Sequence, residues 1–403
     1  MKIAFFATLM TDSPWGGSEE LWYRTARLAL ERGHRVAVVS YGWPEPPRQL
    51  RELQEQGARL LPLGHFTSWY HARSLHWRIR WKLEQLIVWR ALARWKPDVV
   101  CASQGGTYDM VEHRVFTRFL DEQDVPFVVI SQYNTEENPL GSEGQRHAAI
   151  GYLSRAHRVA FVAGRNLLAA ERHLGVRLPN AVVVRNPVNL SDLGPVPYPN
   201  GDVVAMANVA RMNANYKGQD VLFEALAGER WRDRRWVLRL YGAGPDRPYL
   251  ERLARHFGIG DRVEFRGHVA DIRSVWAENH LLVMPSRSEG TPLAMVEAML
   301  CARPSVVTDV GGNLEWVEEP ATGFVADAPL PRCLDAAIAR AWEARDRWEA
   351  IGRRAHEAAM SRIDPHPDET ILAMLAEARD SVVSGQWSVK TAPPLYPPAR
   401  GQE

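Results

Sequence analysis

Short hydrophobic runs alternate with longer segments of mixed polarity in the first half of the chain. The runs have strand length, whereas the segments between them show the apolar spacing that is typical of helices. Gly33 separates the first predicted helix from the strand that follows it. Strands are predicted at 2–7, 35–40, 98–101 and 126–131, and helices at 18–32 and 70–95. This order predicts parallel strands joined by right-handed helical crossovers.

The same alternation restarts after a segment rich in proline and glycine. Residues 194–201 read Gly-Pro-Val-Pro-Tyr-Pro-Asn-Gly and follow a strand predicted at 181–185, so they are interpreted as a linker. Beyond this linker, strands are predicted at 203–209, 236–241, 262–265, 281–285 and 305–308, and helices from 219 and at 246–257, 271–278, 292–301 and 366–384. A chain of 403 residues is also too long for one ordinary hydrophobic core.

These patterns predict an α/β protein of two Rossmann-like, doubly wound domains that face each other across a cleft. The carboxyl ends of both sheets would meet at that cleft, which is where such folds bind ligands. We expect an N-terminal domain at 1–186, a C-terminal domain at 201–365, a helix at 366–385 that crosses back to the first domain, and a disordered tail at 386–403.

Composition and charge exclude several classes of partner and location. The chain is 46% hydrophobic and 24% charged, as globular proteins are, and its formal net charge of +1 gives no overall attraction to nucleic acid. No signal-peptide pattern and no apolar stretch of membrane-spanning length is present, so a cytoplasmic location is expected. Cys101, Cys301 and Cys333 lack the spacing of a metal site and are interpreted as buried small hydrophobic residues.

The most informative segment lies between the strand predicted at 281–285 and the helix predicted at 292–301. It reads Ser-Arg-Ser-Glu-Gly-Thr-Pro-Leu-Ala-Met-Val-Glu. The main-chain N–H groups of Gly290, Thr291 and Leu293 would lie at a helix N-terminus, where they and the helix dipole favour a diphosphate. Pro292 suits the first turn of this helix.

Two glutamates in this segment have the spacing needed to bind different parts of one ligand. Glu289, on the loop before the helix, can accept hydrogen bonds from the hydroxyls of a sugar. Glu297 would stand about 7 Å further along the helix axis, where it can bind the hydroxyls of a ribose. The segment therefore predicts a site for a sugar attached to a nucleoside diphosphate.

Two cations follow the first strand of the predicted second domain. Cleavage of a sugar–phosphate bond leaves negative charge on the departing phosphate, and that charge needs either a metal ion or fixed cations nearby. The chain contains no Asp-x-Asp sequence, so we expect Arg211 and Lys217 to neutralise the diphosphate, with no metal and no resident cofactor.

Together these segments resemble the retaining GT-B glycosyltransferases, the glycosyl transferases of group 1 that include family 4. The Glu-x7-Glu spacing, the Lys217–Asp220 segment and the Asp-Val-Gly-Gly-Asn-Leu-Glu sequence at 309–315 carry the resemblance, which is strong over 201–325 and loose over 1–185. It implies a metal-independent hexosyltransferase that moves a sugar, with retention, from a nucleotide sugar to an acceptor hydroxyl in glycan, polysaccharide or glycolipid biosynthesis. A UDP-sugar is expected rather than a GDP-sugar. The N-terminal domain would bind the acceptor and the C-terminal domain the donor.

The resemblance also assigns roles to particular residues. Arg211, Lys217 and Glu289 would be catalytic, while His268 and Val269 would contact the nucleobase. The remaining donor-binding residues would be Gly16, Gly17, Gly290, Thr291, Pro292, Leu293 and Glu297.

The first domain departs from the family pattern at one position. Gly16 and Gly17 resemble the Gly-Gly-x-Glu loop of the family, although a purely structural turn is an open alternative. Where many relatives carry a histidine after the strand at 127–130, this chain has Gln132, which cannot be a general base. A retaining front-face reaction does not need this base, because the leaving phosphate oxygen takes the acceptor proton. Gln132 could still contact the sugar or the acceptor through a hydrogen bond.

Residues 69–96 combine tryptophans with arginines and lysines and have two interpretations. A helix with a stripe of Trp77, Trp81, Val88, Leu92 and Trp95 could lie on the inner membrane surface as a peripheral contact. The favoured interpretation is that the stripe packs on the sheet and arginine stems cover its flanks. The acceptor also stays open among a glycan, a lipid-linked molecule and a small molecule.

Two other functions are compatible with the same fold. A sugar-nucleotide 2-epimerase would break the same sugar–phosphate bond without an acceptor, and a catalytically inactive scaffold would keep the fold alone. Incubation with the donor alone separates the epimerase from the transferase, and absence of donor binding identifies the scaffold.

Overall fold

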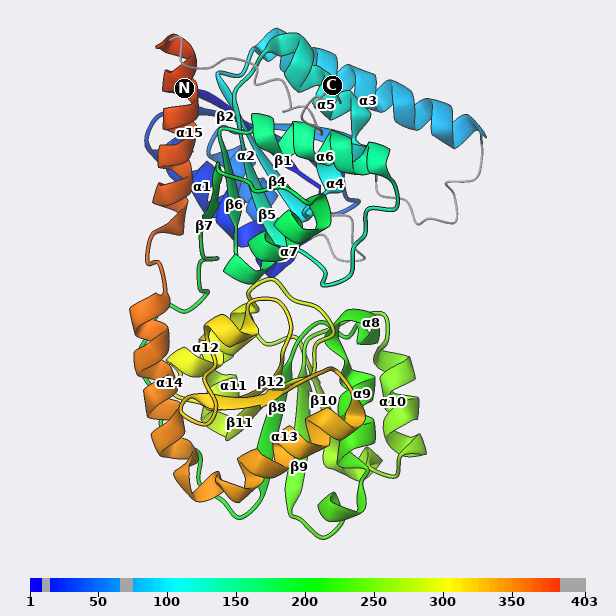
Figure 1. The fold of residues 1–403 in the computed structure, drawn as a ribbon, viewed down its shortest axis with the longest axis vertical. Coiled ribbons are helices and arrows are strands. Elements are labelled where there is room, and N and C mark those ends of the chain that lie inside the picture. The colour runs from blue at the N-terminus through cyan, green and yellow to red at the C-terminus, as the bar shows by residue number, and fades with distance from the viewer. Residues whose placement is uncertain (9–14, 66–74, 385–403) are drawn as a thin grey trace, which may run out of the picture. The chain divides into compact units, whose positions relative to one another are not determined.

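The computed structural model describes residues 1–8, 15–65 and 75–384, with the side chains of 65 and 75–84 left out of the description. The chain divides into two compact units (Figure 1). Unit 1 contains residues 1–187 together with the chain from 365 onward, and unit 2 contains residues 188–364. The tail predicted at 386–403 lies outside the described residues. No helix of the described ranges is long and apolar enough to cross a membrane.

Unit 1 is built on a sheet of seven parallel strands, counted over its described residues, in the order β3-β2-β1-β4-β5-β6-β7. The strands are β1 (Lys2–Ala7), β2 (Arg35–Gly42), β3 (Arg59–His65), β4 (Val99–Gly106), β5 (Phe127–Tyr133), β6 (Arg158–Phe161) and β7 (Ala181–Val183). The α-helices are α1 (Glu20–Glu31), α2 (Arg48–Glu55), α3 (Leu75–Trp95), α4 (Asp109–Glu112), α5 (Arg114–Gln123), α6 (Glu143–Arg155), α7 (Gly164–Leu174) and α15 (Pro367–Val383).

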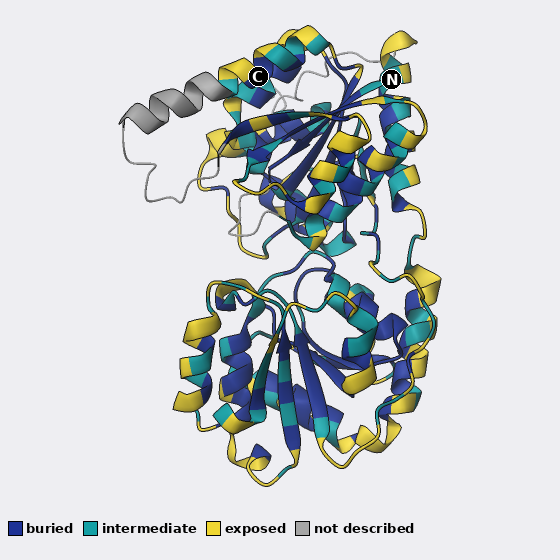
Figure 2. Ribbon diagram, turned by 180° about the vertical axis from the view of Figure 1, so that it is seen from behind, coloured by how far each residue is buried: buried dark blue, intermediate teal, exposed yellow. Residues whose placement is uncertain are grey.

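Helices cover both faces of this sheet because successive strand residues point to opposite sides. Ala4 and Phe6 of β1 pack in one hydrophobic cluster with residues of α3 to α7. Ile3 and Phe5 pack in a second cluster with residues of α1, α2 and α15. The strands are accordingly buried along most of their length (Figure 2).

Unit 2 has a sheet of six parallel strands in the order β10-β9-β8-β11-β12-β13. The strands are β8 (Val204–Val209), β9 (Trp236–Tyr241), β10 (Val263–Gly267), β11 (Leu281–Met284), β12 (Ser305–Thr308) and β13 (Gly323–Ala326). The α-helices are α8 (Ala214–Lys217), α9 (Gln219–Leu226), α10 (Arg247–His256), α11 (Ile272–Glu278), α12 (Leu293–Leu300), α13 (Pro331–Glu343) and α14 (Trp348–Arg362). Two hydrophobic clusters again lie on the two faces of the sheet. The prediction of two Rossmann-like α/β sheets is therefore confirmed.

The end of α3 packs on the unit 1 sheet, as the favoured interpretation of this basic segment requires. Val88, Trp89 and Leu92 are buried, and the Trp89 ring stacks on Phe6 with centroids 5.2 Å apart. Ile87, on another face of α3, stays 66% exposed. The side chains at 75–84, including the first tryptophans of the predicted stripe, lie outside the described residues, so membrane contact through 69–96 stays a prediction.

The cysteine interpretation was correct for two of the three residues. Cys101 and Cys301 are buried, and all three thiols are free. Cys333 is only partly buried, because it lies near the beginning of α13, where it packs against the edge of a hydrophobic cluster.

Candidate functional site

Loops that follow adjacent strands of unit 2 pack against each other closely enough to require glycine. Gly218, between α8 and α9, has a φ of +65°, and a Cβ there would lie 2.1 Å from the carbonyl oxygen of Pro285, directly after β11. Gly311, after β12, has a φ of +49°, and its Cβ would lie 2.1 Å from the carbonyl oxygen of Glu289. The main-chain N–H of Gly312 donates to the carbonyl of Gly290 at 2.7 Å. These contacts fix the loop that carries Glu289.

Lys217 and Glu289, both predicted to be catalytic, form an ion pair. The Lys217 Nζ and Glu289 Oε1 atoms are 2.6 Å apart, and the Ser286 hydroxyl donates to the same carboxylate oxygen at 2.7 Å. The Glu289 side chain is 7% exposed and the Lys217 side chain 26%. The structure therefore brings together two segments that are 72 residues apart and holds a cation beside a nearly buried carboxylate.

The two residues at the start of α9, Gln219 and Asp220, join the Lys217 segment to neighbouring loops of unit 2. The Gln219 side-chain amide donates to the carbonyl of Arg211 at 2.9 Å. Asp220 accepts two hydrogen bonds from the Arg287 guanidinium, at 2.7 and 2.8 Å. This bidentate pair ties the start of α9 to the loop after β11, so it fixes Lys217 relative to Glu289.

Arg287 and Ser286 were not among the predicted site residues. Both lie in the segment that the sequence singled out, and Asp220 was already recognised beside Lys217. Asp220 and Arg287 have opposite charges and lie in two segments that were both predicted to reach the same site, which is the signal that could have suggested their pairing. Arg211 is half-buried directly after β8, and its carbonyl is held by Gln219.

The beginning of α12 differs by one residue from the prediction. The helix starts at Leu293, and Pro292 is its N-cap, with an extended backbone (φ −73°, ψ 117°). The Pro292 carbonyl accepts a hydrogen bond from the Met295 N–H, as the carbonyl of an N-cap residue does. Thr291 is buried beside it. Ahead of Met295, the main-chain N–H groups of Leu293 and Ala294 have no carbonyl acceptor within the helix, so this end of α12 favours an anion.

Glu297 lies one turn further into α12 and is almost completely buried. Its exposed fraction is 7%, and burial raises the pKa of its carboxyl from 4.5 to about 7, against the opposing effect of a hydrogen bond from the main chain of Asn189. Unlike Glu289, it has no cation within bonding distance among the described residues.

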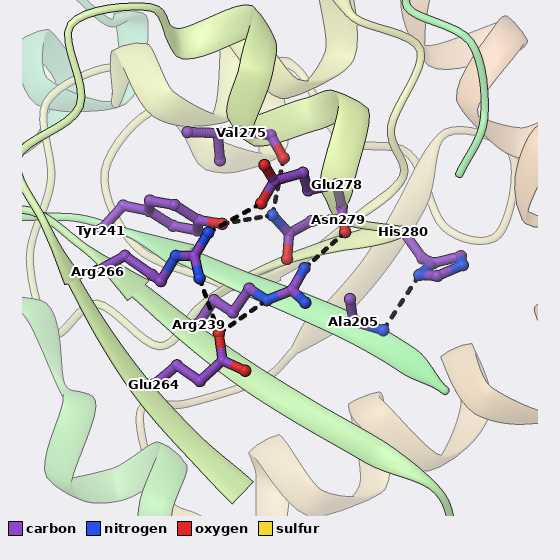
Figure 3. A network of polar contacts seen from close by, with 9 residues as sticks. All are labelled: Ala205, Arg239, Tyr241, Glu264, Arg266, Val275, Glu278, Asn279 and His280. Atoms are coloured by element: carbon purple, nitrogen blue, oxygen red, sulfur yellow. Dashed lines mark hydrogen bonds and ion pairs between the residues drawn. The ribbon is translucent and has the colours of Figure 1, made fainter. Parts of the chain in front are cut away.

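The loop after β10 carries the two residues predicted to contact a nucleobase. His268 is exposed and Val269 is half-buried against a hydrophobic cluster, following Gly267 with its φ of +73°. A polar network fixes the start of this loop (Figure 3). Its contacts join Arg239 to Glu264 at 3.1 Å, Arg266 to Glu264 at 3.3 Å, Arg266 to Glu278 at 3.2 Å, and Asn279 to the Tyr241 hydroxyl at 2.9 Å. Strands β9 and β10 and helix α11 are thereby linked just before His268.

In unit 1, Gly16 and Gly17 lead into α1. Gly16 has an extended φ of −146°, and among the described residues a Cβ there would meet the Ser18 hydroxyl at an ordinary contact distance of 3.6 Å. Crowding by the described residues of unit 1 therefore does not explain a glycine at position 16. Glu19, which follows, is buried and accepts a hydrogen bond from the Trp22 indole at 2.6 Å, while burial raises the pKa of its carboxyl to about 7.

Gln132 lies inside β5 rather than after it and is 4% exposed. Its Oε1 atom accepts a hydrogen bond from the Asn186 side-chain amide at 2.8 Å. Its Nε2 atom has no hydrogen-bond partner among the described residues. The Gln132 side-chain amide therefore has an N–H donor at the carboxyl end of β5 that could bind a ligand. In the same described ranges, no group of three or more His, Cys, Asp or Glu side chains is arranged so that it could hold a metal ion.

The family match and the two similar proteins below are all described as glycosyltransferases. Residues 204–344 match the family described as "Glycosyl transferases group 1". An uncharacterized glycosyltransferase of Haemophilus influenzae is 29% identical over 337 residues, which cover 81% of this chain and 86% of that protein. The alpha-D-kanosaminyltransferase of Streptomyces kanamyceticus is 36% identical over 111 residues, which cover 27% of this chain but only 29% of that enzyme.

The fold has close structural counterparts at low sequence identity. The crystal structure of Anabaena Alr3699/HepE in complex with UDP and glucose aligns with a TM-score of 0.71 at 20% identity, over 94% of this chain and 100% of that one. Residues 204–344 of this chain therefore match the glycosyl transferases of group 1, and the chain has the GT-B fold.

Proposed function

We propose that this protein is a retaining, metal-independent glycosyltransferase that uses a nucleotide sugar, with UDP as the nucleotide. The observation that carries the proposal is the Lys217–Glu289 ion pair, 2.6 Å long, on a loop that opens into the N-terminus of α12. A carboxylate that binds sugar hydroxyls and a cation that binds phosphate are the two groups that a sugar–diphosphate bond requires on its two sides.

The donor would lie along this edge of unit 2 in a defined order. Glu289 accepts hydrogen bonds from the transferred sugar, and the diphosphate binds at the start of α12 with Lys217 and Arg211 nearby. Glu297 receives the ribose hydroxyls, and the main chain at His268 contacts the nucleobase. UDP is chosen because the structurally similar Anabaena protein was crystallised with UDP and glucose.

The chemical step needs no separate general base in this arrangement. The acceptor hydroxyl attacks the anomeric carbon on the face from which the diphosphate departs. The bond between that carbon and the phosphate oxygen breaks, the new glycosidic bond forms, and the acceptor proton moves to the departing oxygen. Lys217 and Arg211 stabilise the charge that develops on this oxygen. Gln132, an amide, can position a hydroxyl without taking a proton.

The epimerase alternative is not favoured by any observation. It would need acidic or basic side chains to move protons, and the position predicted for such a group holds Gln132. None of the proteins compared above is named as an epimerase.

The test is a thermal-shift screen of UDP, GDP and their sugars in the presence of EDTA. A ligand at 100 times its Kd stabilises the folded state by about 2.7 kcal/mol, so UDP and one UDP-sugar should raise the Tm. Lys217→Ala should abolish most of this shift, whereas Arg252→Ala, which removes an exposed cation from the same unit, should not. No shift with any nucleotide would indicate a scaffold, and a shift that depends on added Mg²⁺ would contradict the metal-free site.

A further inference from the structure

Three adjacent strands of unit 1 begin with a cation. Lys2 is the first residue of β1, Arg35 of β2 and Arg59 of β3. Lys2 lies directly opposite Arg35 in the β1–β2 register, and Arg59 is paired with Ala37 in the β2–β3 register. Because side chains alternate along a strand, all three cations point to the face that α3 covers. The residues two positions further along each strand, Ala4, Ala37 and Leu61, belong to the cluster on that face.

These cations line an open hollow against the last turns of α3. Its volume is about 360 Å³, within the range that is typical of small-molecule sites. Its walls are Lys2, Arg35, Arg59, Ala91, Arg94 and Trp95. Among the described residues, the hollow is lined by four cations, one half-buried indole and no acidic side chain.

The structure explains only part of this charge. The Lys2 ammonium donates to the Trp95 carbonyl at 3.1 Å, and Arg94 lies in the last turn of α3, where the helix dipole favours cations. Neither Arg35 nor Arg59 forms an ion pair with a carboxylate of the described residues, and the nearby Asp98 carboxylate accepts a hydrogen bond from the Lys2 main-chain N–H at 2.7 Å. Like charges side by side on a sheet destabilise it unless a counter-ion is present.

We propose that this hollow binds a phosphate-bearing anion. Arginine guanidinium groups bind phosphate oxygens in pairs, and the Trp95 ring offers an apolar face to whatever the phosphate is attached to. The hollow lies at the amino ends of the strands, the edge opposite to the one that carries Gln132, and it does not include any donor residue of unit 2. The site is independent of the proposed transferase function. Soluble phosphorylated molecules and phospholipid headgroups share this chemistry.

The test is calorimetric titration with sodium pyrophosphate. Wild type, the double variant Arg35→Ala/Arg59→Ala, Lys217→Ala and the control Arg51→Ala are compared, since Arg51 is an exposed arginine of unit 1 outside the hollow. The double variant should bind pyrophosphate at least about tenfold more weakly at this site, while Arg51→Ala should bind as wild type does. Lys217→Ala should retain this site, which separates it from a diphosphate site in unit 2.

Two further measurements identify the source of the phosphate and guard against a structural explanation. Without anion, the double variant should melt at the wild-type temperature or above, because mutually repelling charges are removed, whereas loss of a structural ion pair would lower the Tm. Co-sedimentation with phosphatidylglycerol vesicles but no binding of pyrophosphate, both compared with the double variant, would assign the site to a lipid headgroup. The proposal is overturned if neither probe binds wild type, or if both bind the double variant equally well.

Discussion

Glu297→Gln should stabilise the protein in a pH-dependent way. The carboxyl is buried with one main-chain hydrogen bond, and burial raises its pKa from 4.5 to about 7. A group with a raised pKa in the folded state binds more protons there than in the unfolded chain. The stability it contributes is therefore present below pH 4.5 and is lost as the pH rises through about 7.

The size of the effect follows from the two pKa values. At about 1.4 kcal/mol per pH unit, the difference between 4.5 and about 7 corresponds to about 3 kcal/mol of unfolding free energy lost by wild type at pH 8. Glutamine has nearly the same shape, can accept the hydrogen bond from Asn189 and carries no charge, so the variant avoids this loss. It should be more stable than wild type by up to about 3 kcal/mol at pH 8 and by under about 1 kcal/mol at pH 5.

Urea unfolding at pH 5, 6, 7 and 8 measures the difference directly. The unfolding curves are fitted both to a two-state model and to a model with an intermediate, because a protein of two units need not unfold in one step. Glu318→Gln is the matched control, since Glu318 is an exposed carboxylate of the same unit. A Glu297→Gln curve that parallels wild type at all four pH values would show that Glu297 carries no burial cost, and the reasoning would fail.

Three other outcomes are expected. Lys217→Ala should lower turnover by about a hundredfold or more, because a fixed cation at developing charge is worth on the order of 3 kcal/mol; turnover within a few-fold of wild type would remove its role. Gly311→Ala should cost about 1–3 kcal/mol of stability and weaken donor binding, since its Cβ would lie 2.1 Å from the Glu289 carbonyl oxygen; an unchanged Tm and affinity would contradict this. Activity should survive excess EDTA, and a loss that Mg²⁺ or Mn²⁺ restores would refute the metal-free assignment.

Much of the fold was predictable because long apolar runs and glycine breaks are local signals. Strands β1, β9 and β12 have the predicted bounds. Strand β3 was not predicted, because its sequence contains Pro62, which is tolerated only at a sheet edge, and β3 is an edge strand. Strand β13, Gly323–Ala326, is too short and too small in its side chains to be recognised without its neighbours.

The candidate site was predictable by residue type but not by geometry. The sequence singled out Lys217 and Glu289 separately, but their ion pair depends on how the loops after β8 and β11 meet. That meeting depends on Gly218, whose left-handed backbone and close approach to Pro285 appear only in three dimensions. The burial of Glu297 is likewise a tertiary property, because its partner Asn189 lies more than a hundred residues away.

The central claim is that this edge of unit 2 binds a nucleotide sugar. It is tested most directly by calorimetric titration of two variants with UDP and UDP-sugars, alongside an initial-rate assay of sugar transfer. Glu289→Gln should leave the affinity for UDP nearly unchanged but cut transfer severely, because it acts on the sugar. Glu297→Ala should weaken the binding of both UDP and the sugar nucleotide by about 1.5–3 kcal/mol, because it removes a charge-assisted hydrogen bond to the ribose. If both variants bind UDP and the donor as wild type does and turn over normally, the donor does not bind here.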